Sequence, residues 1–219
     1  MSTGQIVREK PLGIYGDEYT SQVLPGDGWR QRHDALKWAL ADICRSAHWT
    51  VEVEPSGLFA KSVPPSSDPE EVHKSLQNIL PDLLVLESTG GSFWIADVKG
   101  VYSRAKYTPG LRDKKPRHAV NLRASQVNNE YIRKATAADR KHNSTPDGVS
   151  GPIAKELASY PPVRGLAFGS FFEASDSVDH LVASAAKAEA DYEWKNLGGA
   201  SYEAAYSAFF SSPGTAPVV

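Results

Sequence analysis

Three charged residues stand out because they interrupt apolar segments of the chain. Asp82 directly precedes the apolar run 83–86, and Asp97 and Lys99 interrupt the apolar segment that begins at residue 93. Side chains two residues apart on a strand point to the same face, so Asp97 and Lys99 would lie together. Burying an unpaired charge is costly, and these residues therefore need a partner or a chemical task.

A β-hairpin is the element that would bring these residues together. The runs 83–86 and 93–98 are rich in β-branched, aromatic and other apolar residues, which is typical of strands covered on both faces. Residues 88–92 read Ser-Thr-Gly-Gly-Ser and supply the backbone freedom of a turn. Pro81 lacks an N–H group and suits the first position of a strand.

The converging groups would suit a hard cation and a phosphodiester. Mg²⁺ prefers one or two carboxylates and keeps several waters, so Asp82 and Asp97 are the candidate ligands for Mg²⁺, with Mn²⁺ as a substitute. Lys99 is the candidate catalytic lysine, because its ammonium could position the attacking water or stabilise developing charge. The alternative is a structural Asp97–Lys99 pair at a strand end, with Asp82 in a turn.

The residue that completes this site remains open between four candidates. His33, near the start of a predicted helix over 30–47, could ligate a metal or orient water through its neutral imidazole, and it is our candidate catalytic residue. Asp34 is its rival, since hard cations prefer oxygen. Glu52 and Glu54 share a face of the preceding strand, but an exposed edge would explain them equally well.

A basic segment follows the D-x-K sequence. Of the chain's 24 Lys and Arg residues, 12 lie between 99 and 141. Such a cluster beside carboxylates favours contacts of the basic segment 102–141 with a nucleic-acid backbone, although a solvated surface would also explain it. The candidate substrate contacts are Arg104, Lys106, Arg123, Gln126, Tyr131 and Lys134. Tyr131 could equally be a core aromatic residue.

Further elements follow from apolar periodicity and turn residues. Strands are predicted over 49–53 and 163–172, and residues 102–118 form a basic loop marked by Pro and Gly. Besides 30–47, helices are predicted over 69–77, 119–141, 151–160, 177–195 and 202–210.

Composition excludes several classes of protein. The 219 residues fit one domain with a sizeable core, and no apolar run is long enough to span a bilayer. The lone Cys44 rules out an internal disulfide or a cysteine-rich zinc site, and an intracellular setting is expected. No Walker loop, G-x-S-x-G motif or two-histidine helical spacing is present.

Pro81-Asp82 and Asp97-Val98-Lys99, with the order of elements around them, resemble the PD-(D/E)xK nuclease superfamily. The resemblance implies an α/β fold with a restriction-endonuclease-like core: a mixed four-stranded sheet, built from an antiparallel meander plus one added strand and flanked by helices. Residues 28–197 would form this domain, between an irregular arm over 1–27 and a short helix with a loose tail over 198–219.

The resemblance also implies an activity, namely metal-dependent hydrolysis of DNA phosphodiesters. Arg30 with His33, the sequence Val53-Glu54-Pro55 and residues 165–169 resemble the restriction-like endonuclease of site-specific retrotransposons, which implies a target-nicking enzyme. Its expected partner domain is a polymerase or a recombination protein. A repair, recombination or restriction nuclease is one alternative. A non-catalytic module that binds nucleic acid or scaffolds a complex is the other.

Overall fold

A four-stranded mixed sheet forms the centre of the molecule. In the computed structural model, which describes residues 28–64, 69–88, 91–101, 117–169, 173–194, 196 and 200–211, the strands are β1 (Thr50–Val53), β2 (Leu83–Leu86), β3 (Phe93–Val101) and β4 (Arg164–Gly169). Their order is β1-β2-β3-β4; β1, β2 and β3 pair antiparallel, and β4 pairs parallel to β3. The predicted mixed sheet is confirmed.

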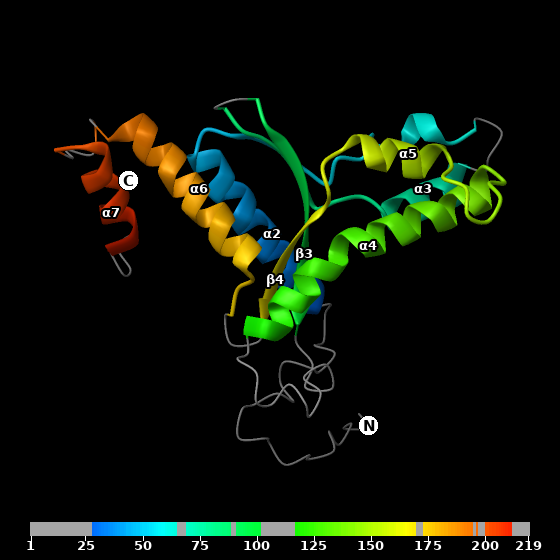
Figure 1. Ribbon diagram of the computed structural model, residues 1–219, viewed down its shortest axis with the longest axis horizontal. Helices are drawn as coiled ribbons and strands as arrows, with labels where there is room; N and C mark the ends of the chain where they lie inside the picture. Colours follow the sequence, from blue (N-terminus) through cyan, green and yellow to red (C-terminus); the bar gives the residue numbers. More distant parts are fainter. Residues whose placement is uncertain are drawn as a thin grey trace, which may run out of the picture.

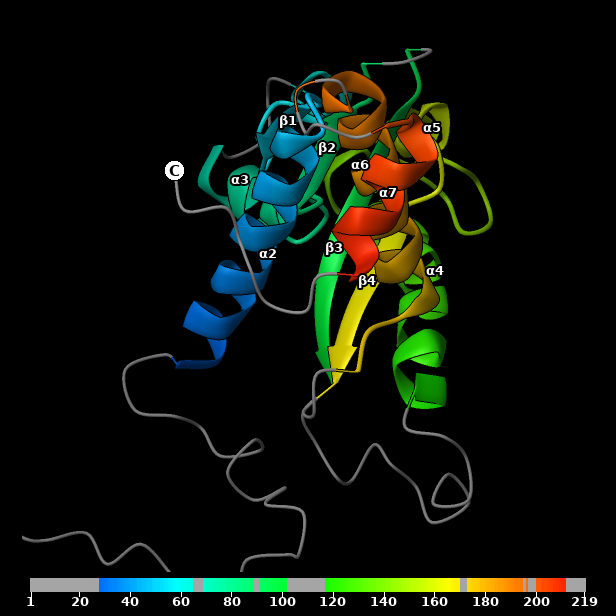
Figure 2. The ribbon, with the colours of Figure 1, turned by 90° about the vertical axis from the view of Figure 1, so that its left-hand side faces the viewer.

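Helices cover both faces of this sheet (Figures 1 and 2). Helices α2 and α6 lie on one face, and α4 crosses the other, with α3 and α5 beside its far end. Within the described residues, no helix is both long and apolar enough to cross a membrane. The helical elements are α2 (Gly28–Ser46), the 3-10 turn η1 (Ala60–Ser62), α3 (Pro69–Gln77), α4 (Arg117–His142), α5 (Pro152–Ser159), α6 (Asp176–Glu193) and α7 (Tyr202–Ser211).

The side chains of β3 alternate between two cores. Trp94 and Val98 pack with residues of α2 and α6, whereas Ile95 packs with α4 and α5. Because successive strand residues point to opposite faces, Asp97 and Lys99 project to the same side as Ile95, toward α4. The sheet therefore directs both polar residues of the D-x-K sequence at one helix.

Gly165 brings that helix close to the strand. It pairs with Asp97 across β3 and β4, and a Cβ atom added at Gly165 would lie 2.3 Å from the backbone oxygen of Ala124 on α4. No real Cβ tolerates such a contact. Glycine at this position lets α4 rest directly on β4, next to Asp97.

Strand β3 is longer than the predicted run. It extends to Val101 because Lys99, Gly100 and Val101 pair in parallel with β4. Residues 102–116 of the predicted basic loop, with Arg104 and Lys106, lie outside the described residues, as do the predicted arm over 1–27 and residues 170–172 at the end of the predicted last strand. The last two residues of the predicted loop, Arg117 and His118, instead begin helix α4.

Candidate active site

The sheet register sets Asp82 and Asp97 opposite each other. Leu83 pairs with Ala96, so one further step along the two strands places Asp82 across from Asp97. On the other side of Asp82, its carbonyl oxygen accepts the backbone N–H of Glu54 at 2.9 Å. Glu54, Asp82 and Asp97 thus occupy one row across β1, β2 and β3.

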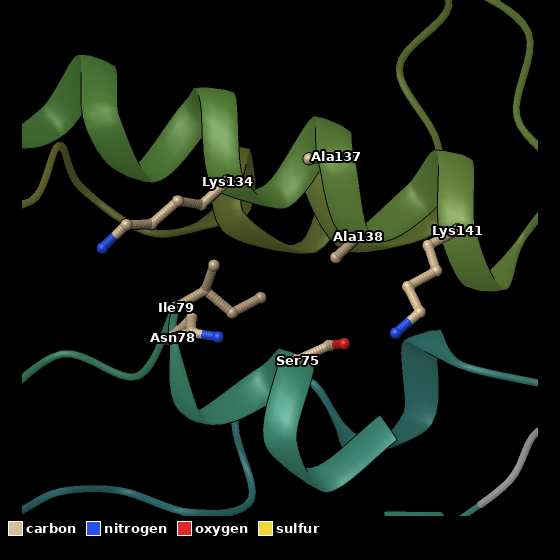
Figure 3. Close-up of a pocket in the computed structure, with 7 residues that line it drawn as sticks. All are labelled: Ser75, Asn78, Ile79, Lys134, Ala137, Ala138 and Lys141. Carbon is tan, nitrogen blue, oxygen red and sulfur yellow. The ribbon is translucent and has the colours of Figure 1, made fainter. Parts of the chain in front are cut away.

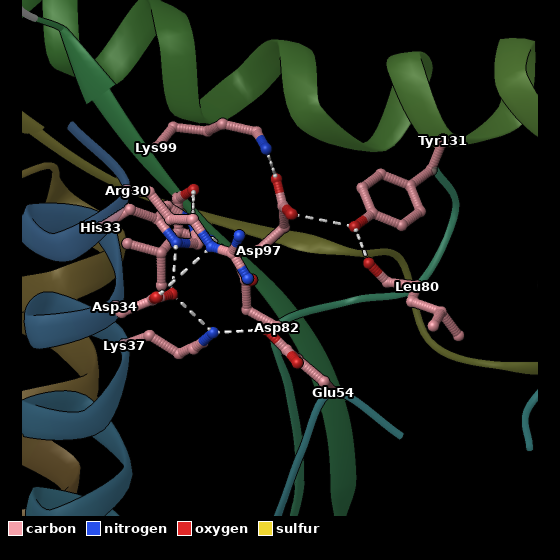
Figure 4. A network of polar contacts seen from close by, with 11 residues as sticks. Arg30, His33, Asp34, Lys37, Glu54, Leu80, Asp82, Asp97, Lys99 and Tyr131 are labelled. Atoms are coloured by element: carbon pink, nitrogen blue, oxygen red, sulfur yellow. Dashed lines mark hydrogen bonds and ion pairs between the residues drawn. The ribbon is translucent and has the colours of Figure 1, made fainter. Parts of the chain in front are cut away.

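Asp82 is buried and surrounded by donors (Figure 4). Its Oδ2 accepts the Val98 backbone N–H at 2.6 Å and lies 3.2 Å from Nε2 of His33. The same Nε2 lies 3.2 Å from the Val98 carbonyl oxygen. Both neighbours of Nε2 are acceptors, so this nitrogen carries a proton. The carboxylate is therefore held between β3 and helix α2.

The surroundings of Asp82 favour its charged form. Burial raises the pKa of this carboxyl, but the His33 ring, the Val98 amide and the Lys99 ammonium together outweigh burial and hold the pKa below its usual range. The hydrogen bond to Asp82 in turn raises the pKa of His33 above 6.5, against the effect of its own burial. Asp82 and His33 therefore stabilise each other as an ion pair.

Asp97 is more deeply enclosed, with 4% of its surface exposed. Its Oδ1 lies 2.9 Å from the Tyr131 hydroxyl, and its Oδ2 is ion-paired with the Lys99 ammonium. Burial raises the pKa of Asp97, with a further contribution from the charge of Asp82, and the attraction of Lys99 does not cancel this rise. Unlike Asp82, this carboxyl resists ionisation.

Tyr131 links Asp97 to the backbone that precedes β2. Its hydroxyl lies 2.7 Å from the Leu80 carbonyl oxygen as well as 2.9 Å from Asp97. The phenol has one proton for two acceptors, and burial raises its pKa so that it stays protonated. The Tyr131 hydroxyl is therefore the donor that the Asp97 carboxylate and the Leu80 carbonyl share.

A polar face of α2 runs toward the site. Arg30, His33, Asp34 and Lys37 recur at the i, i+3, i+4, i+7 spacing that places side chains on one side of a helix. Lys37 is 3% exposed, and its ammonium lies 2.9 Å from Asp34 Oδ1 and 2.5 Å from Glu54 Oε1. Glu54 has φ +51°, a left-handed conformation that is uncommon outside glycine.

Lys37 is the site residue that the sequence analysis missed. A signal for it existed: Lys37 lies three, four and seven positions before Leu40, Ala41 and Cys44, which are all buried. A lysine in line with such a stripe needs a partner for its charge. Here its partners are the carboxylates of Asp34 and Glu54.

The candidates for completing the site have different positions. His33 contacts Asp82 directly, while Asp34 lies 3.5 Å from Nδ1 of His33 and also binds Lys37. Glu54 joins the row through Lys37, and Glu52 is exposed on β1 opposite Leu84. The geometry therefore ranks His33 first, because it alone of the four contacts an aspartate of the row with its side chain.

The described substrate candidates all lie on α4 but have different surroundings. Arg123 donates two hydrogen bonds to Glu130, at 2.5 and 3.0 Å, and Gln126 is exposed. Tyr131 is 2% exposed and contacts Asp97, and the Lys134 ammonium lies 5.4 Å from the centre of its ring. Lys134 thus adjoins the carboxylate row through Tyr131.

The donor atoms at the centre are those that a hard cation prefers. Asp82 and Asp97 offer carboxylate oxygens, and the Val98 carbonyl lies beside them. The buried Oδ2 of Asp97 is in contact with the Lys99 ammonium, which balances its charge. In this part of the chain, no three His, Cys, Asp or Glu side chains form a closed metal cluster.

Comparison with known proteins identifies no relative of this chain. Searches with the chain against family models, curated proteins and solved structures find no match.

Proposed function

We propose that this chain is a metal-dependent nuclease with a restriction-endonuclease-like core, which hydrolyses DNA phosphodiester bonds. The observation that carries the proposal is the pair of facing carboxylates, Asp82 and Asp97, with Lys99 ion-paired to the second. Supporting it is the order of a helix, three antiparallel strands, a second long helix and a parallel strand, in α2, β1, β2, β3, α4 and β4. Two shorter insertions interrupt this order: η1 with α3 between β1 and β2, and α5 between α4 and β4.

Asp82 and Asp97 would hold Mg²⁺ or Mn²⁺, which keeps several waters and so needs few protein ligands. When bound, the cation would lower the pKa of a water and offset charge developing on the phosphate. The protein's own residues have distinct tasks. His33 fixes the orientation of Asp82, Tyr131 fixes that of Asp97, and Lys99 supplies a positive charge beside the reacting phosphate.

The metal site and a basic surface would not select a particular base sequence in the substrate, because phosphate contacts position a nucleic acid without reading its bases. The target-nicking endonuclease of a retroelement is the specific function we favour within this class. A repair, recombination or restriction nuclease would use the same carboxylates. A plasmid-nicking assay distinguishes a nuclease from the remaining alternative, a module that binds nucleic acid without cutting it.

Plasmid nicking tests the proposal. Purified protein should relax supercoiled plasmid with Mg²⁺ or Mn²⁺, and EDTA should abolish the reaction. Asp97→Ala should lower the rate by about 10³-fold, the upper range for loss of one group that stabilises a transition state. The matched control is Asp42→Ala, since Asp42 is an exposed acid on α2 that pairs only locally with Arg45.

Two results would contradict the nuclease proposal. If nicking persists in EDTA or in Asp97→Ala, the proposed metal site at Asp82 and Asp97 takes no part in the cleavage. Tight DNA binding by the wild type without any cleavage, across both metals, would favour the scaffolding module instead.

A further inference from the structure

A pocket of about 280 Å³ lies between α3 and α4 (Figure 3). Ile79, Ala137 and Ala138 give it an apolar lining. Lys134 and Lys141 also line it, and their ammonium groups extend toward opposite ends of the pocket. An apolar space between two cations suits a ligand with a flat apolar part and flanking negative charges.

The two lysines form part of one face of α4. They are seven residues apart, which corresponds to two helical turns and about 10 Å of rise. Lys141 lies 3.7 Å from the exposed carboxylate of Glu71, a surface pair that contributes little and that a phosphate could replace. The positive charge of this face is therefore accessible to an anion.

The pocket lies next to the candidate active site. The Lys134 ammonium rests over the ring of Tyr131, and the Tyr131 hydroxyl contacts Asp97. A strand whose phosphate reached Lys99 could continue along α4 past Lys134 to Lys141. The positions of the three lysines thus mark a path from the carboxylate row into the pocket.

From this geometry we infer that the pocket binds one unpaired nucleotide of the substrate strand, with its base on the apolar lining and its flanking phosphates on Lys134 and Lys141. The ligand class rests on the proposed nuclease function. Proteins that bind single strands combine a cationic track with surfaces that accept bases. A paired base is held in the duplex, so the nucleotide in the pocket comes from a single-stranded end, flap or gap.

Charge substitutions test the phosphate contacts. Binding of a fluorescent single-stranded oligonucleotide is measured by anisotropy in EDTA, so that no cleavage intervenes. The double variant Lys134→Gln/Lys141→Gln should bind about tenfold more weakly, and the slope of log K against log salt should fall by roughly 1.4, at about 0.7 for each lost contact. The control, Arg133→Gln/Arg140→Gln, removes two exposed charges at the same seven-residue spacing on the same helix.

A base-deletion experiment tests the pocket itself. Wild-type protein should bind a thymidine oligonucleotide several-fold more tightly than the same backbone made of abasic sites. Ala137→Trp should fill the pocket and bind the two probes equally, while Ser125→Trp, exposed elsewhere on α4, should preserve the difference.

Two outcomes would overturn the inference. In one, wild-type protein does not distinguish the base-containing probe from the abasic probe. In the other, the lysine double variant matches the arginine control. Both measurements are made without metal, so they are independent of the plasmid assay: loss of nicking would remove the nuclease proposal alone, and loss of the base preference would remove the pocket inference alone.

Discussion

Asp82 and Asp97 face each other across β2 and β3, but helix α2 supplies the side-chain partner of Asp82 and helix α4 that of Asp97. The surroundings of the two carboxylates, called the α2 side and the α4 side of the site, therefore differ. On the α2 side, Asp82 accepts a backbone N–H and faces the protonated Nε2 of His33. On the α4 side, Asp97 meets a phenol and a single ammonium, Lys99, in a more buried position. The pKa of Asp82 is held below its usual range, whereas burial raises that of Asp97.

This difference has opposite consequences for stability. A carboxyl whose pKa is lowered on folding stabilises the protein above its unfolded pKa, and this contribution is lost as the pH falls through the folded pKa. A carboxyl whose pKa is raised contributes stability only at lower pH, and the contribution is lost as the pH rises through the folded pKa. At neutral pH, ionised Asp82 is therefore favourable, and ionised Asp97 is a cost that the fold bears for its site.

The largest expected effect comes from neutralising each carboxylate in turn. Asp82→Asn and Asp97→Asn should each reduce nicking by about 10³-fold, because each removes a proposed metal ligand. Their stabilities at pH 7 should move in opposite directions. Asp82→Asn should destabilise the protein by about 1–3 kcal/mol, since it leaves buried donors without their charged acceptor, and Asp97→Asn should unfold at a higher urea concentration than wild type.

Urea unfolding followed by circular dichroism makes the comparison, with Asp42→Asn as the control for loss of an exposed acid. Two destabilised variants of similar magnitude would contradict the asymmetry of the site. Two unchanged variants would show that neither carboxylate is coupled to folding.

The features of the site also differ in how far they could be predicted from the sequence. The hairpin with Asp82, Asp97 and Lys99 followed from apolar runs and turn residues, because strand alternation is a local rule. His33 was expected near the site, and its contact with Asp82 agrees with that expectation. The extension of β3 to Val101 could not be predicted, since its partner β4 lies more than 60 residues later in the chain.

Contacts between distant segments set the remaining limits. Lys37 reaches Glu54 from another element, and Tyr131 reaches Asp97 from 34 residues away. A sequence pattern records which face a residue occupies but not which side chain meets it there. Gly165 is similar: its meaning depends on the approach of α4 to β4, which only the packed structure reveals.

A smaller effect should follow from removing one hydroxyl on the α4 side. Tyr131→Phe keeps the buried ring but deprives Asp97 and the Leu80 carbonyl of their shared donor. We expect about a tenfold loss of nicking and about 1–2 kcal/mol of destabilisation, the usual range for a buried group left unsatisfied. The Mg²⁺ concentration for half-maximal activity should rise, because Asp97 is less well oriented.

The control for that substitution is Tyr160→Phe, which removes a hydroxyl from a tyrosine whose ring packs against Phe93 instead of the site. A merely structural Tyr131 would lower stability without shifting the Mg²⁺ dependence. Unchanged Mg²⁺ dependence in Tyr131→Phe would therefore show that the Tyr131 hydroxyl does not orient Asp97.

The smallest effect should appear on the α2 side as a pH dependence. Asp82 raises the pKa of His33, so the protonated ring stabilises the fold most fully below about pH 6.5, and this contribution is lost as the pH rises through the folded pKa. His33→Gln should therefore be less stable than wild type by about 1 kcal/mol at pH 6, a modest value for a partly exposed charged hydrogen bond. The gap should narrow toward pH 9 in urea titrations, with the exposed His118→Gln as control. A gap that widens with pH would mean that the imidazole acts in its neutral form, and the ionised pair with Asp82 would then not be what holds α2 against the site.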